Sequence, residues 1–218
     1  MHSKAFMEYN QTNEKFMRGI TNMKIALTFD DGPNLGTTVD VLALLKKYKI
    51  KASFFIIGNL INDSTIKILK QITESGCEIE NHSFTHSFMT HLTKQEMWYE
   101  TDKTSNLIEE ITGRRPRFFR PPYIDVNQEM FDSIPLVFIS GEGVEDWNDE
   151  IKAEERVSRL LTKIRDGDIV LLHDLEGNME TVKALEEVIP EWIAEGYEFL
   201  TVAELFDQAN KTPKAQDG

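Results

Sequence analysis

Short apolar runs alternate along this chain with longer segments in which apolar residues recur every three or four positions. Short runs are typical of buried strands in a parallel sheet, and the wider spacing is typical of helices with one apolar face. The pattern predicts seven strands, at Lys24–Phe29, Ala52–Ile57, Cys77–Asn81, Arg117–Phe119, Leu136–Ser140, Ile169–Leu172 and Tyr197–Leu200. Repeated strand–helix units predict an α/β fold, and seven such strands suggest a barrel.

Two helices follow from apolar residues at positions i, i+3, i+4 and i+7. These apolar stripes are Val41, Leu44, Leu45 and Tyr48, and Val157, Leu160, Leu161 and Ile164. Two more helices should begin at capping boxes, formed by Thr93 with Glu96 and by Thr201 with Glu204. The first should end near Gly113, and the apolar stripes should pack against the outside of the sheet.

The 218 residues, of which 40% are hydrophobic, suit a single domain with one core. We expect this domain to span residues 23–209, between an N-terminal extension (1–22) and a C-terminal tail (210–218). Cys77 is the only cysteine, so no intrachain disulfide can form, and we expect it to be a small buried hydrophobe. Trp98 and Trp192 fall on helical segments and are expected in the core.

The formal net charge of -13 argues against nucleic acid or an anionic membrane as a partner, because both require a basic surface. No run reaches the roughly 18 apolar residues of a membrane span, and residues 1–22 lack the apolar region of a signal peptide. A soluble protein is therefore expected. It would be cytoplasmic as the chain stands, or extracellular if a signal was trimmed.

Two adjacent carboxylates, Asp30 and Asp31, end the first predicted strand just before Gly32 and Pro33. Like charges this close raise each other's pKa unless a cation or hydrogen-bond donors keep them ionised. His82 and His86 are spaced so that their imidazoles can converge, and two histidines with one aspartate form a facial metal site with open positions. The residues therefore favour hydrolytic metal catalysis over the alternatives of a solvated Asp-Asp-Gly-Pro turn and separately buried histidines.

Polar residues follow the carboxyl ends of several predicted strands. In a βα barrel these ends share one face, which is where such folds place their active sites. We expect Asp146 and Trp147 to follow the 136–140 strand after a turn at Gly141–Gly143. The strand-end residues are Asp30, Asp31, His82, Arg120, Asp146, Trp147 and His173.

Five segments recur in a familiar order: Thr-Phe-Asp-Asp-Gly-Pro at 28–33, His-Ser-Phe-Thr-His at 82–86, Arg-Pro-Pro-Tyr at 120–123, Asp-Trp at 146–147 and Leu-Leu-His at 171–173. Between about Met23 and Asp207 the chain resembles the polysaccharide deacetylase family, carbohydrate esterase family 4. Each motif alone is weak, but the ordered set is specific. The resemblance implies a distorted (β/α)7 or (β/α)8 barrel that hydrolyses acetyl groups from sugars with a divalent metal.

The resemblance implies that Asp31, His82 and His86 hold the metal and that Asp30 is the general base. A metal lowers the pKa of bound water, and an ionised carboxylate can then take its proton. Neighbouring side chains on a regular strand point to opposite faces, so Gly32–Pro33 should bend the chain to bring both aspartates to one site. Zinc is the expected ion, with cobalt or manganese possible.

Three further residues are implied to act without touching the metal. Arg120 would pair with Asp30 and keep it ionised, although a surface arginine before two prolines is the alternative. His173 would protonate the leaving atom, and Asp146 would orient His173 and raise its pKa. A simple strand-end turn at His173 remains the other interpretation.

The resemblance also implies how the acetyl group is held. The backbone N–H of Tyr123, with the metal, would form the oxyanion hole. Trp147 and Leu171 would surround the acetyl methyl group, and Pro121 would contact the substrate. The alternative for Trp147 is that it is an ordinary core residue.

Gly143 bears on the substrate. Many family members that act on N-acetylglucosamine polymers carry an extra Asp three residues before the Asp-Trp pair, whereas here that position is Gly143. The chain therefore looks most like the acetyl-xylan esterase branch, with an acetylated polysaccharide or oligosaccharide as partner. An N-acetylglucosamine deacetylase acting on peptidoglycan or chitooligosaccharides is the alternative, and a non-catalytic glycan-binding barrel is a third hypothesis. The oligomeric state is left open.

Overall fold

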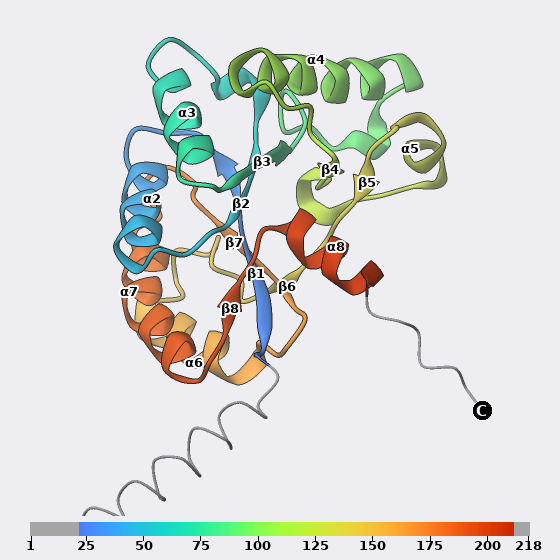
Figure 1. The fold of residues 1–218 in the computed structure, drawn as a ribbon. Helices are drawn as coiled ribbons and strands as arrows, with labels where there is room; N and C mark the ends of the chain where they lie inside the picture. The colour runs from blue at the N-terminus through green and yellow to red at the C-terminus, as the bar shows by residue number, and fades with distance from the viewer. Residues whose placement is uncertain (1–21, 212–218) are drawn as a thin grey trace, which may run out of the picture.

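The computed structural model describes residues 22–211 (Figure 1). The expected N-terminal extension and C-terminal tail lie outside the described residues, except for residue 22 and the helical residues 210–211. None of the described helices combines the length and apolar character needed to cross a membrane.

Eight parallel strands form one curled sheet at the centre of the molecule. They are β1 (Lys24–Gly32), β2 (Ser53–Ile56), β3 (Glu78–Asn81), β4 (Phe118–Phe119), β5 (Val137–Phe138), β6 (Glu142–Gly143), β7 (Ile169–His173) and β8 (Glu198–Phe199). Their order is β5-β4-β3-β2-β1-β7-β6, and β8 pairs with the start of β1. Among the described strands no pairing joins β5 to β6, so the barrel is incomplete there. The predicted α/β barrel is thus confirmed in its distorted form.

Seven α-helices and three short 3-10 helices connect these strands within the described residues. The α-helices are α2 (Thr37–Tyr48), α3 (Ile66–Glu74), α4 (Lys94–Thr112), α5 (Gln128–Ser133), α6 (Ala153–Lys163), α7 (Met179–Ala194) and α8 (Val202–Lys211). The 3-10 helices are η1 (Gly58–Leu60), η2 (Met89–His91) and η3 (Pro122–Ile124). In Figure 1, α2 and α7 lie side by side along one side of β1, and α8 lies on the other side.

The alternation of side chains along β1 divides the core into two parts. One face of β1 carries Ile25, Leu27 and Phe29. These residues belong to the larger apolar cluster, which includes residues of α2 and α7. Ala26 faces the other way and packs with residues of α8. Asp30 shares this inner face because it lies four positions after Ala26, so the period-two geometry of the strand itself directs Asp30 into the barrel.

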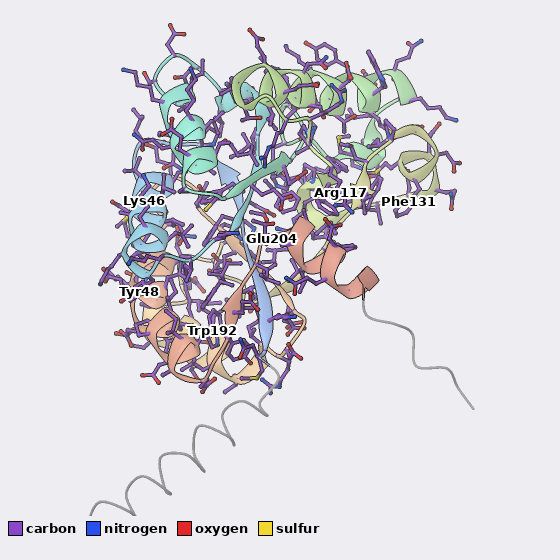
Figure 2. All side chains as sticks on the ribbon, in the orientation of Figure 1. Lys46, Tyr48, Arg117, Phe131, Trp192 and Glu204 are labelled. Carbon is purple, nitrogen blue, oxygen red and sulfur yellow. The ribbon has the colours of Figure 1, made fainter. Side chains whose placement is uncertain are left out.

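Both predicted capping boxes are present, and Gly113 ends α4 in the left-handed conformation with φ 73°. Cys77 is buried, as predicted. Trp192 is also buried, and Figure 2 shows it near the lower end of α7. It packs with Phe199 at a ring-centroid distance of 6.2 Å.

Three predictions were wrong. Trp98 is 53% exposed, because the buried face of α4 runs through Met97, Thr101 and Ile108 and leaves position 98 outside it. Leu161 is 38% exposed at the edge of the α6 stripe. Residues Glu142–Gly143, expected as part of a turn, form β6 against β7. Two residues are too few to produce a periodic signal.

Candidate active site

The strand ends surround one cavity of about 550 Å³. Every strand-end residue singled out from the sequence borders it except Arg120, which is completely buried. Its lining residues are Asp30, Asp31, His82, His86, Pro121, Tyr123, Ile124, Gly143, Glu145, Asp146, Trp147, Leu171 and His173. Segments far apart in sequence therefore meet at the carboxyl end of the sheet, as in barrel enzymes.

A bulge at the end of β1 brings two consecutive aspartates to this cavity. Asp30 pairs with Phe55 and Gly32 with Ile56, so Asp31 is the extra residue, and its φ of 74° is left-handed. The bend thus lies at Asp31, one residue earlier than the predicted bend at Gly32 and Pro33. Gly32 is required for a different reason, because a Cβ atom there would lie 2.6 Å from a carboxylate oxygen of Asp174.

Asp31, His82 and His86 form a cluster suited to a cation. The Nε2 atoms of His82 and His86 lie 3.4 and 3.2 Å from Asp31 Oδ1, and one ligand atom from each residue falls within 4.8 Å of the others. His82 Nδ1 lies 2.7 Å from the carbonyl oxygen of Arg120. If Nδ1 donates its hydrogen there, Nε2 keeps a free lone pair for a metal.

Asp31 Oδ1 is buried and has no hydrogen-bond partner within residues 22–211. Burial raises the pKa of Asp31, but the two nearby imidazoles outweigh it and hold the pKa well below its ordinary value. An ionised buried oxygen facing two imidazole nitrogens is the donor set expected for a divalent metal, so the residues fit such an ion.

The loop that carries His86 is held by Glu100 of α4, which is buried. Its carboxylate accepts the backbone N–H groups of Phe84 and Thr85 at 2.8 and 2.7 Å, and the Thr85 hydroxyl at 2.8 Å. His86 itself has a left-handed φ of 59°. Glu100 is not among the residues predicted from the sequence, although a carboxylate on the inward stripe of an amphipathic helix is a detectable signal.

Asp30 is paired with a buried arginine. Arg120 Nη1 donates to Asp30 Oδ1 at 2.7 Å and to the Thr28 hydroxyl at 2.8 Å, and the guanidinium lies 4.2 Å above the Phe55 ring. Arg120 is 0% exposed, so the alternative of a surface arginine is wrong. The other oxygen, Asp30 Oδ2, lies 3.9 Å from His82 Nε2 and therefore points toward the metal cluster.

On the far side of the cavity, His173 Nδ1 lies 2.8 Å from Asp146 Oδ1. The other oxygen of Asp146 accepts the backbone N–H of His173 and the hydroxyl of Thr181, both at 2.8 Å. Burial lowers the pKa of His173, but the hydrogen bond and charge of Asp146, helped by Asp30 and Asp31, raise it to about 9. This raised pKa favours the protonated form of His173 at neutral pH.

Arg156 supports this pair from behind and was also missed from sequence. It is fully buried in α6 and donates to the Thr181 hydroxyl at 2.7 Å and to Asn178 Oδ1 at 2.6 Å. Thr181 in turn donates to Asp146. An arginine among the apolar positions of a helix was the available signal.

The remaining expected residues form the cavity walls. Trp147 is 58% exposed, so the alternative of a core tryptophan is wrong. Asp146 and Trp147 follow β6 instead of β5, which corrects the expected connection. Gly143 of β6 pairs with Leu171 of β7 beside the cavity. Tyr123 has a left-handed φ of 61° and an exposed ring.

Comparison with known proteins agrees with this geometry. The family described as Polysaccharide deacetylase matches residues 20–134. A bifunctional xylanase/deacetylase from Pseudobutyrivibrio xylanivorans is 43% identical over 88% of this chain and 32% of its own length. The peptidoglycan-N-acetylmuramic acid deacetylase PdaC of Bacillus subtilis (strain 168) is 37% identical over 83% of this chain and 38% of its own length. The chain thus spans about a third of each of these relatives.

Two solved structures share the fold over nearly their whole length. The Xyl-CE4 domain of a multidomain xylanase from the hindgut metagenome of Trinervitermes trinervoides has a TM-score of 0.85 and 42% identity, covering 87% of this chain and 92% of that one. A family 4 acetyl xylan esterase from Clostridium thermocellum, solved with a cobalt ion, has a TM-score of 0.83 and 38% identity, covering 86% and 92%. With more than half of its residues matched by the family, this chain belongs to the polysaccharide deacetylases.

Proposed function

We propose that this chain is a divalent-metal-dependent esterase that removes O-acetyl groups from xylan or xylooligosaccharides. The observation that carries the proposal is the convergence, in one cavity, of an arginine-paired carboxylate, an Asp-His-His cluster and an aspartate-paired histidine. These are the base, the metal ligands and the acid that hydrolysis of an unactivated ester requires.

Asp31, His82 and His86 would hold the metal, and zinc is the ion we propose, with cobalt or manganese able to replace it. When bound, such an ion supplies a Lewis acid that polarises the acetyl carbonyl and lowers the pKa of water. Two nitrogens and one carboxylate oxygen suit zinc, and they leave open positions for substrate.

Asp30 would act as the general base. Its Oδ1 is engaged by Arg120, which fixes the orientation of the carboxylate, and its Oδ2 points toward the metal cluster. Asp30 would therefore accept a proton from the water that attacks the acetyl carbon, while Arg120 neutralises its charge inside the barrel.

His173 would act as the general acid on the opposite side of the substrate. Because Asp146 keeps it protonated at neutral pH, His173 can deliver a proton to the sugar oxygen as the C–O bond breaks, releasing acetate and a sugar hydroxyl. The backbone N–H of Tyr123 would donate to the developing oxyanion, as such donors do in other acyl-transfer sites. Trp147, Leu171 and Pro121 would enclose the acetyl group.

The choice of xylan rests on Gly143 and on the relatives. Gly143 has no side chain to contact a substrate, and it lines the cavity next to Leu171. Three of the similar proteins carry xylanase or acetyl xylan esterase in their names. The strong negative charge of the chain also favours a neutral polysaccharide over an anionic cell-wall polymer.

The test is acetate release, measured side by side on acetylated xylan and on N-acetylchitooligosaccharides with equal amounts of metal-loaded enzyme. The Asp30→Asn variant serves as the matched inactive control. We expect faster release from xylan. Faster release from chitooligosaccharides would replace xylan by an N-acetylglucosamine substrate, and no release from either would favour a non-catalytic glycan-binding barrel.

A further inference from the structure

Two exposed aromatic rings stack on each other at the rim of the cavity. Phe88 belongs to the segment that follows His86, and Tyr123 belongs to η3 after β4. Their ring centroids are 3.9 Å apart and their planes differ by 14°, yet the residues are 46% and 56% exposed. Contiguous exposed apolar surface beside a cavity is typical of a binding site, since it has a free-energy cost when left in water.

The stacked pair continues the cavity outward over the surface. Tyr123 lines the cavity and its ring meets the His86 ring edge-on at 4.7 Å. Phe88 lies beyond Tyr123, outside the cavity lining, and the His91 ring follows at 5.7 Å. A row of rings thus leads from His86 through Tyr123 to Phe88 and His91, which lie outside the cavity lining.

The two segments that carry the rings are held in place by neighbouring residues. The hydroxyl of Thr90, two residues after Phe88, donates to the carboxylate of Asp125, two residues after Tyr123. Met89 is completely buried in an apolar cluster and anchors the Phe88 segment. The pair is therefore a preorganised surface, and a ligand would lose little free energy in ordering it.

We propose that Phe88 and Tyr123 form a platform on which a sugar unit next to the acetylated one packs. The inference rests on the proposed function. A pyranose ring presents C–H groups on its faces, which pack on the electron-rich faces of aromatic rings while its hydroxyl groups stay hydrated. The rings are uncharged, which suits a neutral glycan. A cavity of about 550 Å³ accommodates the acetylated unit, so the platform would determine preference for chain length.

The test compares KM and kcat across acetylated xylooligosaccharides of increasing length. Wild-type KM should fall as the chain grows beyond one sugar. Phe88→Ala should raise KM for the longer substrates about five- to tenfold, with kcat changing little, because one aromatic contact is lost. Phe88→Trp should restore the length dependence, since it keeps an aromatic surface. Trp98→Ala is the matched control, because Trp98 is similarly exposed but lies on α4 away from the cavity.

If KM depends on substrate length in Phe88→Ala as it does in wild type, the platform is overturned. An equal loss of kcat on substrates of every length would also overturn it, because that result would indicate a purely structural role for the loop. A change in oligomeric state with unchanged KM would also overturn it, in favour of a protein contact. Calorimetric binding of unacetylated xylohexaose to wild type and Phe88→Ala needs no turnover. It therefore tests the platform separately from the proposed esterase activity. If acetate is released only from chitooligosaccharides, the proposed substrate fails and the same length series decides the platform on those substrates.

Discussion

Asp30 and Asp31 are neighbours with different surroundings. Arg120 holds Asp30, while Asp31 faces two imidazoles. We predict that Asp30→Asn lowers kcat by about 10²- to 10⁴-fold while keeping the metal, because only the proton acceptor is lost. Asp31→Ala should lose both activity and metal. Metal analysis of the purified variants, with acetate release, checks this, and an empty site in Asp30→Asn would reverse the two roles.

His173 should matter most for poor leaving groups. Replacing His173 by Ala removes the proposed acid, so acetate release from acetylated xylan should fall by about 10²- to 10⁴-fold. An aryl acetate departs without protonation and should lose much less. Initial rates on both substrates give the comparison. Equal losses on the two would show that His173 serves binding or folding instead.

The raised pKa of His173 also predicts a pH profile. If His173 must be protonated, kcat/KM should fall as the pH rises through about 9. Asp146→Asn removes the charge that raises this pKa, so its alkaline limb should move to lower pH. Because the folded pKa lies above the ordinary 6.5, the same interaction stabilises the fold below pH 6.5 and is lost as the pH rises through about 9. An alkaline limb that does not move in Asp146→Asn would contradict the assignment.

Helix α4 positions the loop between His82 and His86, to which it does not belong. Glu100 accepts three hydrogen bonds from Phe84 and Thr85, between His82 and His86. Glu100→Gln keeps the shape but replaces an accepting oxygen by a donor, so metal affinity should fall about 10- to 100-fold, as for other residues that orient metal ligands. Glu110→Gln, exposed on the same helix, is the control. Metal titration of both variants measures the difference, and unchanged affinity in Glu100→Gln would refute the positioning role.

The buried carboxyl group of Glu80 makes the stability of the protein depend on pH. Burial raises the pKa of Glu80 to about 9, and the charge of Glu78 adds to this shift. Glu80 accepts hydrogen bonds from the backbone N–H groups of Arg117 and Phe118, which lower its pKa in part. These bonds connect β3 to the start of β4. A folded pKa above the unfolded value means that stability is present at acidic pH and is lost as the pH rises through about 9.

Glu80→Gln imitates the protonated acid, so its Tm should exceed that of wild type near pH 9 and the difference should shrink toward pH 5. Thermal unfolding across this range is the measurement. Glu198→Gln, on an exposed position of β8, is the control. A parallel shift of Tm at every pH would mean that the substitution acts through packing instead of protonation.

Local patterns were sufficient for much of this molecule. The apolar runs predicted seven of the eight strands, and the capping boxes at Thr93 and Thr201 marked two helix starts, because these features depend on residues close together in sequence. The rule that parallel strands end on one face was enough to bring Asp30, His82 and His173 to one cavity.

Tertiary structure decided what depends on residues distant in sequence. The two-residue strand β6 exists only because β7 pairs with it, and Trp98 is exposed because of the direction in which α4 packs. The bulge at Asp31, with its left-handed φ, depends on the pairing of β1 with β2. Glu100 and Arg156 form hydrogen bonds with Thr85 and Asn178, which lie 15 and 22 positions away. The helical pattern can mark each as a buried charged residue, but the partners of such residues are decided only when folding brings distant groups together.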